Sequence, residues 1–176
     1  MKRLALMLLA LAGCAGGGES TVRTVPAVDL NRYVGTWYEV ARYPNRFEDG
    51  SRLDCTDVTA TYTLRPDGQV GVVNRCRNAA DGEETAARGT AYAVAGAGGA
   101  KLRVSFFWPF YGDYWVLGLA PDYSWAVVGD PARNYLWVLA RTPALPPTAY
   151  EAAVASARAQ GFDAARLKRT AQSTAR

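Results

Sequence analysis

Glu39 is the strongest candidate in this chain for a side chain with a chemical role, because it is a carboxylic acid among apolar neighbours. It lies in the stretch GTWYEVAR, residues 35–42, between apolar neighbours in a segment that has the pattern of a β-strand. A carboxyl group buried in such a strand must be hydrogen-bonded, paired or neutral. Its candidate partners are a tyrosine hydroxyl, Asn74 or an inward-pointing arginine. The carboxyl group then either fixes a polar ligand atom or is a satisfied structural group.

The composition excludes several kinds of chemistry. The 176 residues include no histidine, which excludes Ser-His-Asp and Cys-His catalysis, histidine-ligated haem and most zinc sites. An acid–base reaction would rest on Glu39 and a tyrosine alone, so we expect a binding protein and not an enzyme, with no metal and no cofactor. The net charge is +4, too small to indicate a nucleic-acid partner.

The first 13 residues have the pattern of a signal peptide. Lys2 and Arg3 precede an apolar run from Leu4 to Ala12, which is shorter than the roughly 20 residues that span a bilayer. Residues 11–14, LAGC, resemble the lipobox of bacterial lipoproteins. That resemblance implies that Cys14 becomes the first mature residue and carries acyl chains; the alternative is a plain signal peptide with an incidental cysteine.

These features divide the chain into three parts. Residues 1–13 are the expected signal peptide, residues 14–28 the acylated Cys14 with a flexible tether, and residues 29–176 the folded domain. Ala15 follows the cysteine, and by analogy with enterobacterial sorting this favours the outer membrane. We therefore expect a lipid-anchored protein on the periplasmic side of that membrane.

The pattern from residue 29 onward predicts an all-β domain. Short segments with alternating side chains are separated by turns such as RPDGQ, residues 65–69, at spacings too tight for crossover helices. They predict an eight-stranded antiparallel up-and-down β-barrel. After Pro146 and Pro147, a helix is predicted with Thr148 as its cap and Gly161 beyond its end, packed against the outside. Residues 164–172 suggest a short final edge strand.

Several sequence blocks resemble the bacterial lipocalins, outer-membrane lipoproteins related to apolipoprotein D. They are GTWYEVARYPNRFE, VTATYTL, KLRVSFFWPFYGDYWV, DYSWAVVGDP and YLWVLARTP, in that order. The resemblance implies an eight-stranded barrel that holds one small ligand. It also implies that Gly35 permits a close turn, that Trp37 plugs the closed end and that Arg141 stacks across its indole.

Alternation from Trp37 predicts which side chains face the barrel interior. The expected lining is aliphatic and aromatic with few polar atoms, which suits an acyl chain. The predicted ligand-binding residues are Glu39, Ala41, Tyr43, Tyr62, Asn74, Phe106, Trp108, Tyr135 and Trp137.

Two further groups of residues border the expected mouth. The aromatic stretch SFFWPFYGDYW, residues 105–115, can grip a ligand head group, touch a membrane or a second subunit of a homodimer, or pack against neighbouring loops. Arg42, Arg46 and Arg52 can meet a phosphate or carboxylate, or remain solvated.

Cys55 and Cys76 are candidates for a disulfide, since the chain is expected to be exported. They lie on adjacent predicted strands, but simple hairpin counting places Cys76 opposite about Val58. A bend or bulge before Val58 would be needed to bring the two cysteines together. The alternative is two buried thiols.

The favoured function is a membrane-anchored lipocalin that binds fatty acids or (lyso)phospholipids for envelope lipid maintenance. One alternative is a carrier of a rigid ligand such as a tetrapyrrole, retinoid or sterol. Another is a structural lipoprotein whose barrel is filled by its own bulky side chains.

Overall fold

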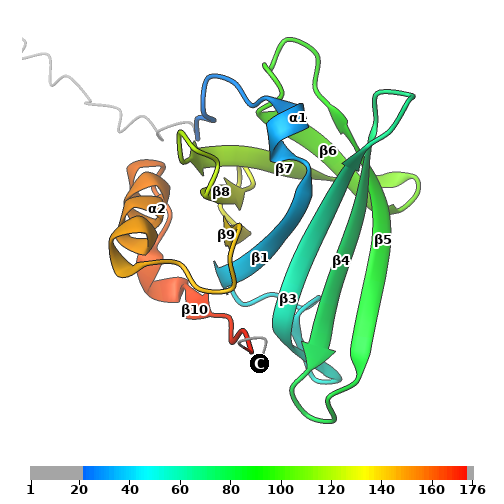
Figure 1. The fold of residues 1–176 in the computed structure, drawn as a ribbon, viewed down its shortest axis with the longest axis vertical. Helices are drawn as coiled ribbons and strands as arrows, with labels where there is room; N and C mark the ends of the chain where they lie inside the picture. The colour runs from blue at the N-terminus through cyan, green and yellow to red at the C-terminus, as the bar shows by residue number, and fades with distance from the viewer. Residues whose placement is uncertain (1–21, 174–176) are drawn as a thin grey trace, which may run out of the picture.

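Antiparallel strands dominate the structure, a computed structural model that describes residues 22–173 (Figure 1). The eight long strands are β1 (Gly35–Arg42), β3 (Leu53–Leu64), β4 (Val70–Asn78), β5 (Glu84–Ala93), β6 (Lys101–Phe107), β7 (Phe110–Leu119), β8 (Trp125–Gly129) and β9 (Leu136–Ala140). From β3 to β9 each strand pairs with the next, and β1 pairs with both β9 and β3, which closes the sheet. This confirms the predicted eight-stranded antiparallel up-and-down barrel.

Alternating side chains divide between an inner and an outer apolar cluster. The inner cluster contains Trp37, Ala60, Tyr62, Val70, Val72, Ala91, Leu102, Val116, Ala126, Val128 and Leu139. The outer cluster contains Val40, Ala41, Tyr43, Leu117, Val127, Leu136, Val138, Ala140, Ala153, Ala157 and Phe162. Helix α2 (Pro147–Ala159) contributes to the outer cluster and packs against β7 and β8 (Figure 1). The stretch GTWYEVAR is apolar on both faces because one face lines the barrel and the other packs in the outer cluster.

A β-bulge in β1 changes which side chains point inward. Glu39 lies opposite Leu139, but Ala41 lies opposite Val138, so Val40 is an extra residue that reverses the alternation. Arg42 therefore faces the interior. Ala41 and Tyr43 pack in the outer cluster instead, and the prediction that they line the barrel is wrong.

The end of the barrel at Trp37, called here the closed end, is held as predicted. Gly35 has a φ of +98°, a conformation that glycine adopts readily. The guanidinium of Arg141 lies 3.8 Å from the Trp37 ring centroid and donates hydrogen bonds to the carbonyls of Arg32, Tyr33 and Thr36. The opposite end, where the loops of residues 43–52, 79–83 and 130–135 and the β6–β7 hairpin gather, is called the mouth.

The segment before β1 packs along the outside of the barrel and then across its closed end. Val22 and Val28 are buried, and the backbone nitrogen of Val28 donates to the carbonyl of Gly98. The expectation of a flexible tether therefore does not hold for residues 22–28, which lead into helix α1 (Leu30–Tyr33). The predicted signal peptide and Cys14 lie outside the described residues. Within residues 22–173, no helix combines the length and the hydropathy needed to span a membrane.

Helix α2 differs from its prediction at the first turn. It begins at Pro147, and the flanking Pro146 makes no side-chain capping hydrogen bond. Pro147 fits the first helical position because its φ is preset and its missing N–H needs no partner. Thr148 is thus inside the helix, and its prediction as the cap is wrong. Gly161 has a φ of +80° just beyond the C-cap, as predicted.

The C-terminal segment seals a seam between β1 and β3. Strand β10 (Lys168–Arg169) pairs with β1, which confirms the suggested edge strand, and the 3₁₀ turn η1 (Ala164–Arg166) precedes it. Nε2 of Gln172 donates to the carbonyl of Glu39 on β1 and to that of Val58 on β3, at 2.8 Å each. The remaining strand, β2 (Asp49–Gly50), pairs with the start of β3.

Candidate ligand-binding site

The inner wall of the barrel changes character between its two ends. At the closed end, Trp37 and Ala126 have no measurable exposure. Toward the mouth, Phe106 and Trp137 pack on the same inner cluster yet remain partly exposed. Apolar side chains that face inward and still contact solvent form a wall that can bind an apolar molecule.

Three tyrosines form a polar floor beneath this wall. The hydroxyl groups of Tyr33 and Tyr114 lie 2.8 Å apart, and that of Tyr114 lies 2.9 Å from that of Tyr62. Burial raises the pKa of Tyr62 to about 12 and also raises the pKa values of Tyr33 and Tyr114. All three therefore stay protonated at neutral pH and satisfy one another's hydrogen bonds.

Glu39 is buried and paired with an inward-pointing arginine, one of its three predicted partners. Nη1 of Arg42 donates to Oε1 of Glu39 at 2.7 Å, and the Thr170 hydroxyl donates to the same oxygen. Arg42 also forms a bidentate pair with Asp49, at 2.9 and 2.8 Å. Its guanidinium is fully engaged by these groups, which leaves the exposed Arg46 and Arg52 as the arginines at the mouth that can meet a ligand phosphate.

The pKa values of Glu39 and Asp49 depend on burial and on the charged groups around them. Burial, with a contribution from Glu48, raises the pKa of Glu39 to about 8 although Arg42 and Thr170 favour its ionised form. Burial alone would raise the pKa of Asp49 as well, but hydrogen bonds from Arg42 and Lys168 outweigh it and lower that pKa well below its usual range. The two carboxyl groups therefore shift in opposite directions, because Glu39 is more deeply buried and lies near Glu48, whereas Asp49 has Lys168 as a second cation.

Glu48 connects this network to the aromatic wall. Its Oε2 accepts hydrogen bonds from Nε1 of Trp137 at 3.1 Å and from Nδ2 of Asn45 at 2.7 Å. The Tyr135 ring stacks on Trp137 with centroids 5.7 Å apart, and Phe47 stacks on Tyr135 at 6.0 Å. Tyr135 precedes β9, so this ladder of rings runs from the interior to the rim.

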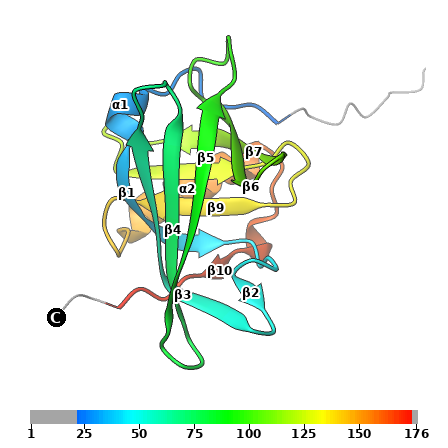
Figure 2. The same ribbon diagram turned by 90° about the vertical axis from the view of Figure 1, so that its right-hand side faces the viewer.

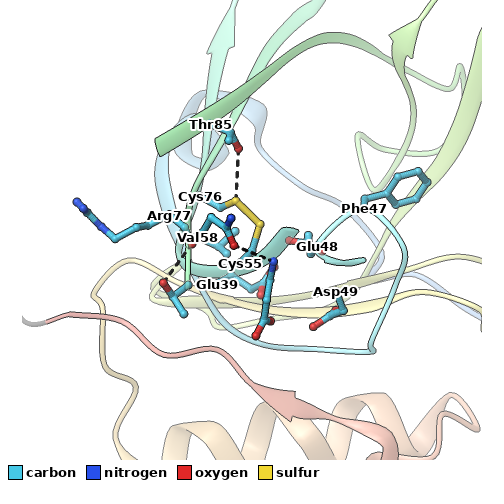
Figure 3. Close-up of a disulfide and its surroundings, with 12 residues drawn as sticks. Glu39, Phe47, Glu48, Asp49, Cys55, Val58, Cys76, Arg77 and Thr85 are labelled. Carbon is cyan, nitrogen blue, oxygen red and sulfur yellow. Dashed lines mark hydrogen bonds between the residues drawn. A yellow bond between two sulfur atoms is a disulfide. The ribbon is translucent and has the colours of Figure 1, made fainter. Parts of the chain in front are cut away.

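The disulfide between Cys55 and Cys76 is formed beside this network (Figure 3). Their Cα atoms are 5.4 Å apart. The register between β3 and β4 shifts between Thr56 and Thr59, which is the bulge that hairpin counting required. The disulfide ties these two strands together at the mouth.

The other predicted binding residues take different places. Asn74 faces inward opposite Ala60, and its Oδ1 is buried with no hydrogen-bond partner among the described residues. Trp108 lies at the tip of the β6–β7 hairpin, 82 % exposed, and does not line the barrel. Sequence reasoning placed Arg42 beside the first loop, not inside the barrel, and it missed Glu48, Tyr114 and Thr170. Of these three, alternation from Val116 signals only Tyr114 as inward-facing. Within residues 22–173, no three His, Cys, Asp or Glu side chains form a group able to hold a metal ion.

Comparisons with known proteins agree on one family. The sequence model described as "Lipocalin-like domain" matches residues 28–172. The outer membrane lipoprotein Blc of Escherichia coli (strain K12) is 43% identical over 146 residues, which cover 83% of this chain and 80% of that protein. Apolipoprotein D of Bos taurus is 36% identical over 160 residues, covering 81% and 80%. Lobster apocrustacyanin A1 superposes with a TM-score of 0.66 at 19% identity, covering 88% and 92%, and shows the fold alone.

Proposed function

The chain belongs to the lipocalin family, and from this premise we propose that its barrel binds the acyl chain of a fatty acid or (lyso)phospholipid. The observation that carries the proposal is the partly exposed apolar wall of Phe106, Val104 and Trp137 toward the mouth, above the tyrosine floor. A long apolar chain fits such a wall because its burial contributes about 0.8 kcal/mol per methylene. The unpartnered Oδ1 of Asn74 supplies an acceptor for a polar ligand atom.

We propose a binding role without catalysis. The candidate acid–base group, Glu39, is bonded to Arg42 and Thr170 and its carboxyl group is buried. A general base must reach the proton that it removes, and burial together with the two contacts to Oε1 keeps this carboxyl group away from solvent. A structural role for Glu39 therefore accounts for its contacts.

An outer-membrane location is supported by the relatives that are outer membrane lipoproteins. We propose that Cys14 carries the acyl chains and that the domain lies on the periplasmic side. Anchoring through several acyl chains on one residue is stable because the buried methylenes add up. Mass spectrometry of the N-terminal peptide tests the anchor separately from the binding site.

Native mass spectrometry of the protein purified without detergent tests the binding proposal. We expect a co-purified fatty acid or phospholipid, and we expect Trp137→Ala to weaken its binding about tenfold or more because it removes part of the wall. Trp115→Ala is the matched control, since Trp115 packs in the outer cluster. A bound ring system such as a sterol, or equal affinity in both variants, would contradict the proposal.

A further inference from the structure

In the half of strand β5 that lies nearer the mouth, one edge has no hydrogen-bonded partner strand among the described residues. It pairs with β4 from Glu84 to Ala91, but among the described residues its pairing with β6 covers only Thr90–Ala93. Residues 84–88 are exposed. Figure 2 shows β5 and the β6–β7 hairpin diverging beyond this crossing. The backbone hydrogen bonding of the barrel wall is therefore interrupted on this side, and this interruption is called here the gap.

The divergence has a local cause in β6. Its register with β7 shifts between Val104 and Phe107, and the ring of Phe106 lies across Gly89 of β5. A Cβ built on Gly89 would come within 2.6 Å of the Ser105 carbonyl oxygen and 2.9 Å of the Phe106 ring. The gap beside β5 thus begins at Phe106, which belongs to the partly exposed inner wall.

The β6–β7 hairpin, which borders the gap, carries solvent-exposed aromatic side chains. Phe107, Trp108 and Phe110 are 80 %, 82 % and 77 % exposed. Residues 104–112, VSFFWPFYG, include no charged side chain. Such a group of large exposed rings marks an interaction surface.

We propose that this side of the barrel is a lateral portal that docks on a lipid bilayer. The hairpin tip enters the head-group region, and an acyl chain passes between β5 and the hairpin to the inner wall. The proposal rests on the proposed function, because a barrel that binds lipid must take it from a membrane. A portal at the bilayer surface shortens the path of the acyl chain through water.

The composition around the gap favours a bilayer over a protein partner. Tryptophan and phenylalanine prefer the interface between head groups and acyl chains. Arg75 on β4 and Arg88 on β5 lie beside the free edge, exposed and without an ion pair among the described residues. Exposed arginines of this kind attract anionic lipid head groups.

The test compares lipid uptake from vesicles with binding of a dissolved ligand. The chain is produced without residues 1–13 and with Cys14→Ser, which removes the anchor and leaves the described fold intact. The portal variant carries Phe107→Ser, Trp108→Ser and Phe110→Ser. The control variant carries Leu64→Ser and Val94→Ser, two exposed apolar residues near the closed end, 39 % and 36 % exposed.

Vesicles of deuterated phosphatidylethanolamine and phosphatidylglycerol supply the lipid, and native mass spectrometry follows the labelled complex over time. We expect uptake by the portal variant to be about tenfold slower or more. Its affinity for monomeric dodecanoate stays within about twofold of wild type, and the control variant matches wild type in both assays.

Two results would overturn the portal. One is uptake from vesicles at the wild-type rate by the portal variant. The other is a wild-type dimer in analytical ultracentrifugation that the portal variant loses without a change in uptake, which would make the tip a contact between copies. Failure of the wild type to bind dodecanoate or vesicle lipid would refute the proposed function itself.

Discussion

Glu39 makes the stability of this protein depend on pH near neutrality. The chain has no histidine, so the side chain that normally titrates between pH 5 and 8 is absent. Burial and Glu48 raise the pKa of Glu39 to about 8 from an ordinary value of 4.5. The folded protein therefore holds a proton over a range in which the unfolded chain has lost it.

The direction and size of the effect follow from that difference. Between pH 4.5 and 8 the folded state binds more protons than the unfolded state, so the free energy of unfolding falls as pH rises. A pKa difference of this size corresponds to about 5 kcal/mol when complete. The lowered pKa of Asp49 acts in the opposite direction, but its contribution is complete above about pH 5 and stays constant in this window.

Urea unfolding followed by tryptophan fluorescence at intervals from pH 5 to pH 9 measures this dependence. We expect the free energy of unfolding of the wild type to fall by about 3–5 kcal/mol across the series. Glu39→Gln removes the titrating group and should flatten the curve, whereas Glu84→Gln, an exposed residue paired with Arg77, should keep it. A flat wild-type curve would refute the reasoning, because it would mean that Arg42 keeps Glu39 ionised throughout.

Three further substitutions test the packing around the site, each by urea unfolding. Replacing Cys55 and Cys76 with serine should cost about 3 kcal/mol, since the disulfide closes a loop with a sequence separation of 21; an unchanged midpoint would contradict this. Arg141→Ala should cost about 2 kcal/mol by removing the stacked cation and its three hydrogen bonds, and lysine should restore less than half. Gly89→Ala should cost about 1–3 kcal/mol because the new methyl group meets the Ser105 carbonyl oxygen and the Phe106 ring; no loss would mean that β6 shifts away from β5 without cost.

Alternation of side chains was enough to predict the eight strands and their antiparallel order, because each strand has one face that must be buried. The same rule failed inside β1, where the extra residue Val40 exchanges the two faces. Nothing in the local sequence marks that bulge, since Ala41 and Tyr43 are apolar enough for either side. The bulge also turns Arg42 inward, so the ion-pair network could not be predicted from alternation.

Contacts between distant segments were the least predictable part of the site. Thr170 reaches Glu39 across 131 residues of sequence, and no periodic pattern joins the two. The disulfide was predictable because hairpin pairing placed its cysteines almost opposite each other. The portal residues were visible as an aromatic cluster, but their exposure depends on the divergence of β5 and β6, which arises from tertiary packing.

The seam between β1 and β3 can close only after residues 168–172 have been synthesised, because Gln172 and β10 provide its last contacts. Residues 168–172 leave the ribosome and the export channel after every strand that they join, so β1 and β3 emerge with their shared border unsealed. Until residues 168–172 have joined the fold, the precursor exposes unpaired backbone of β1 and β3, which favours aggregation and proteolysis.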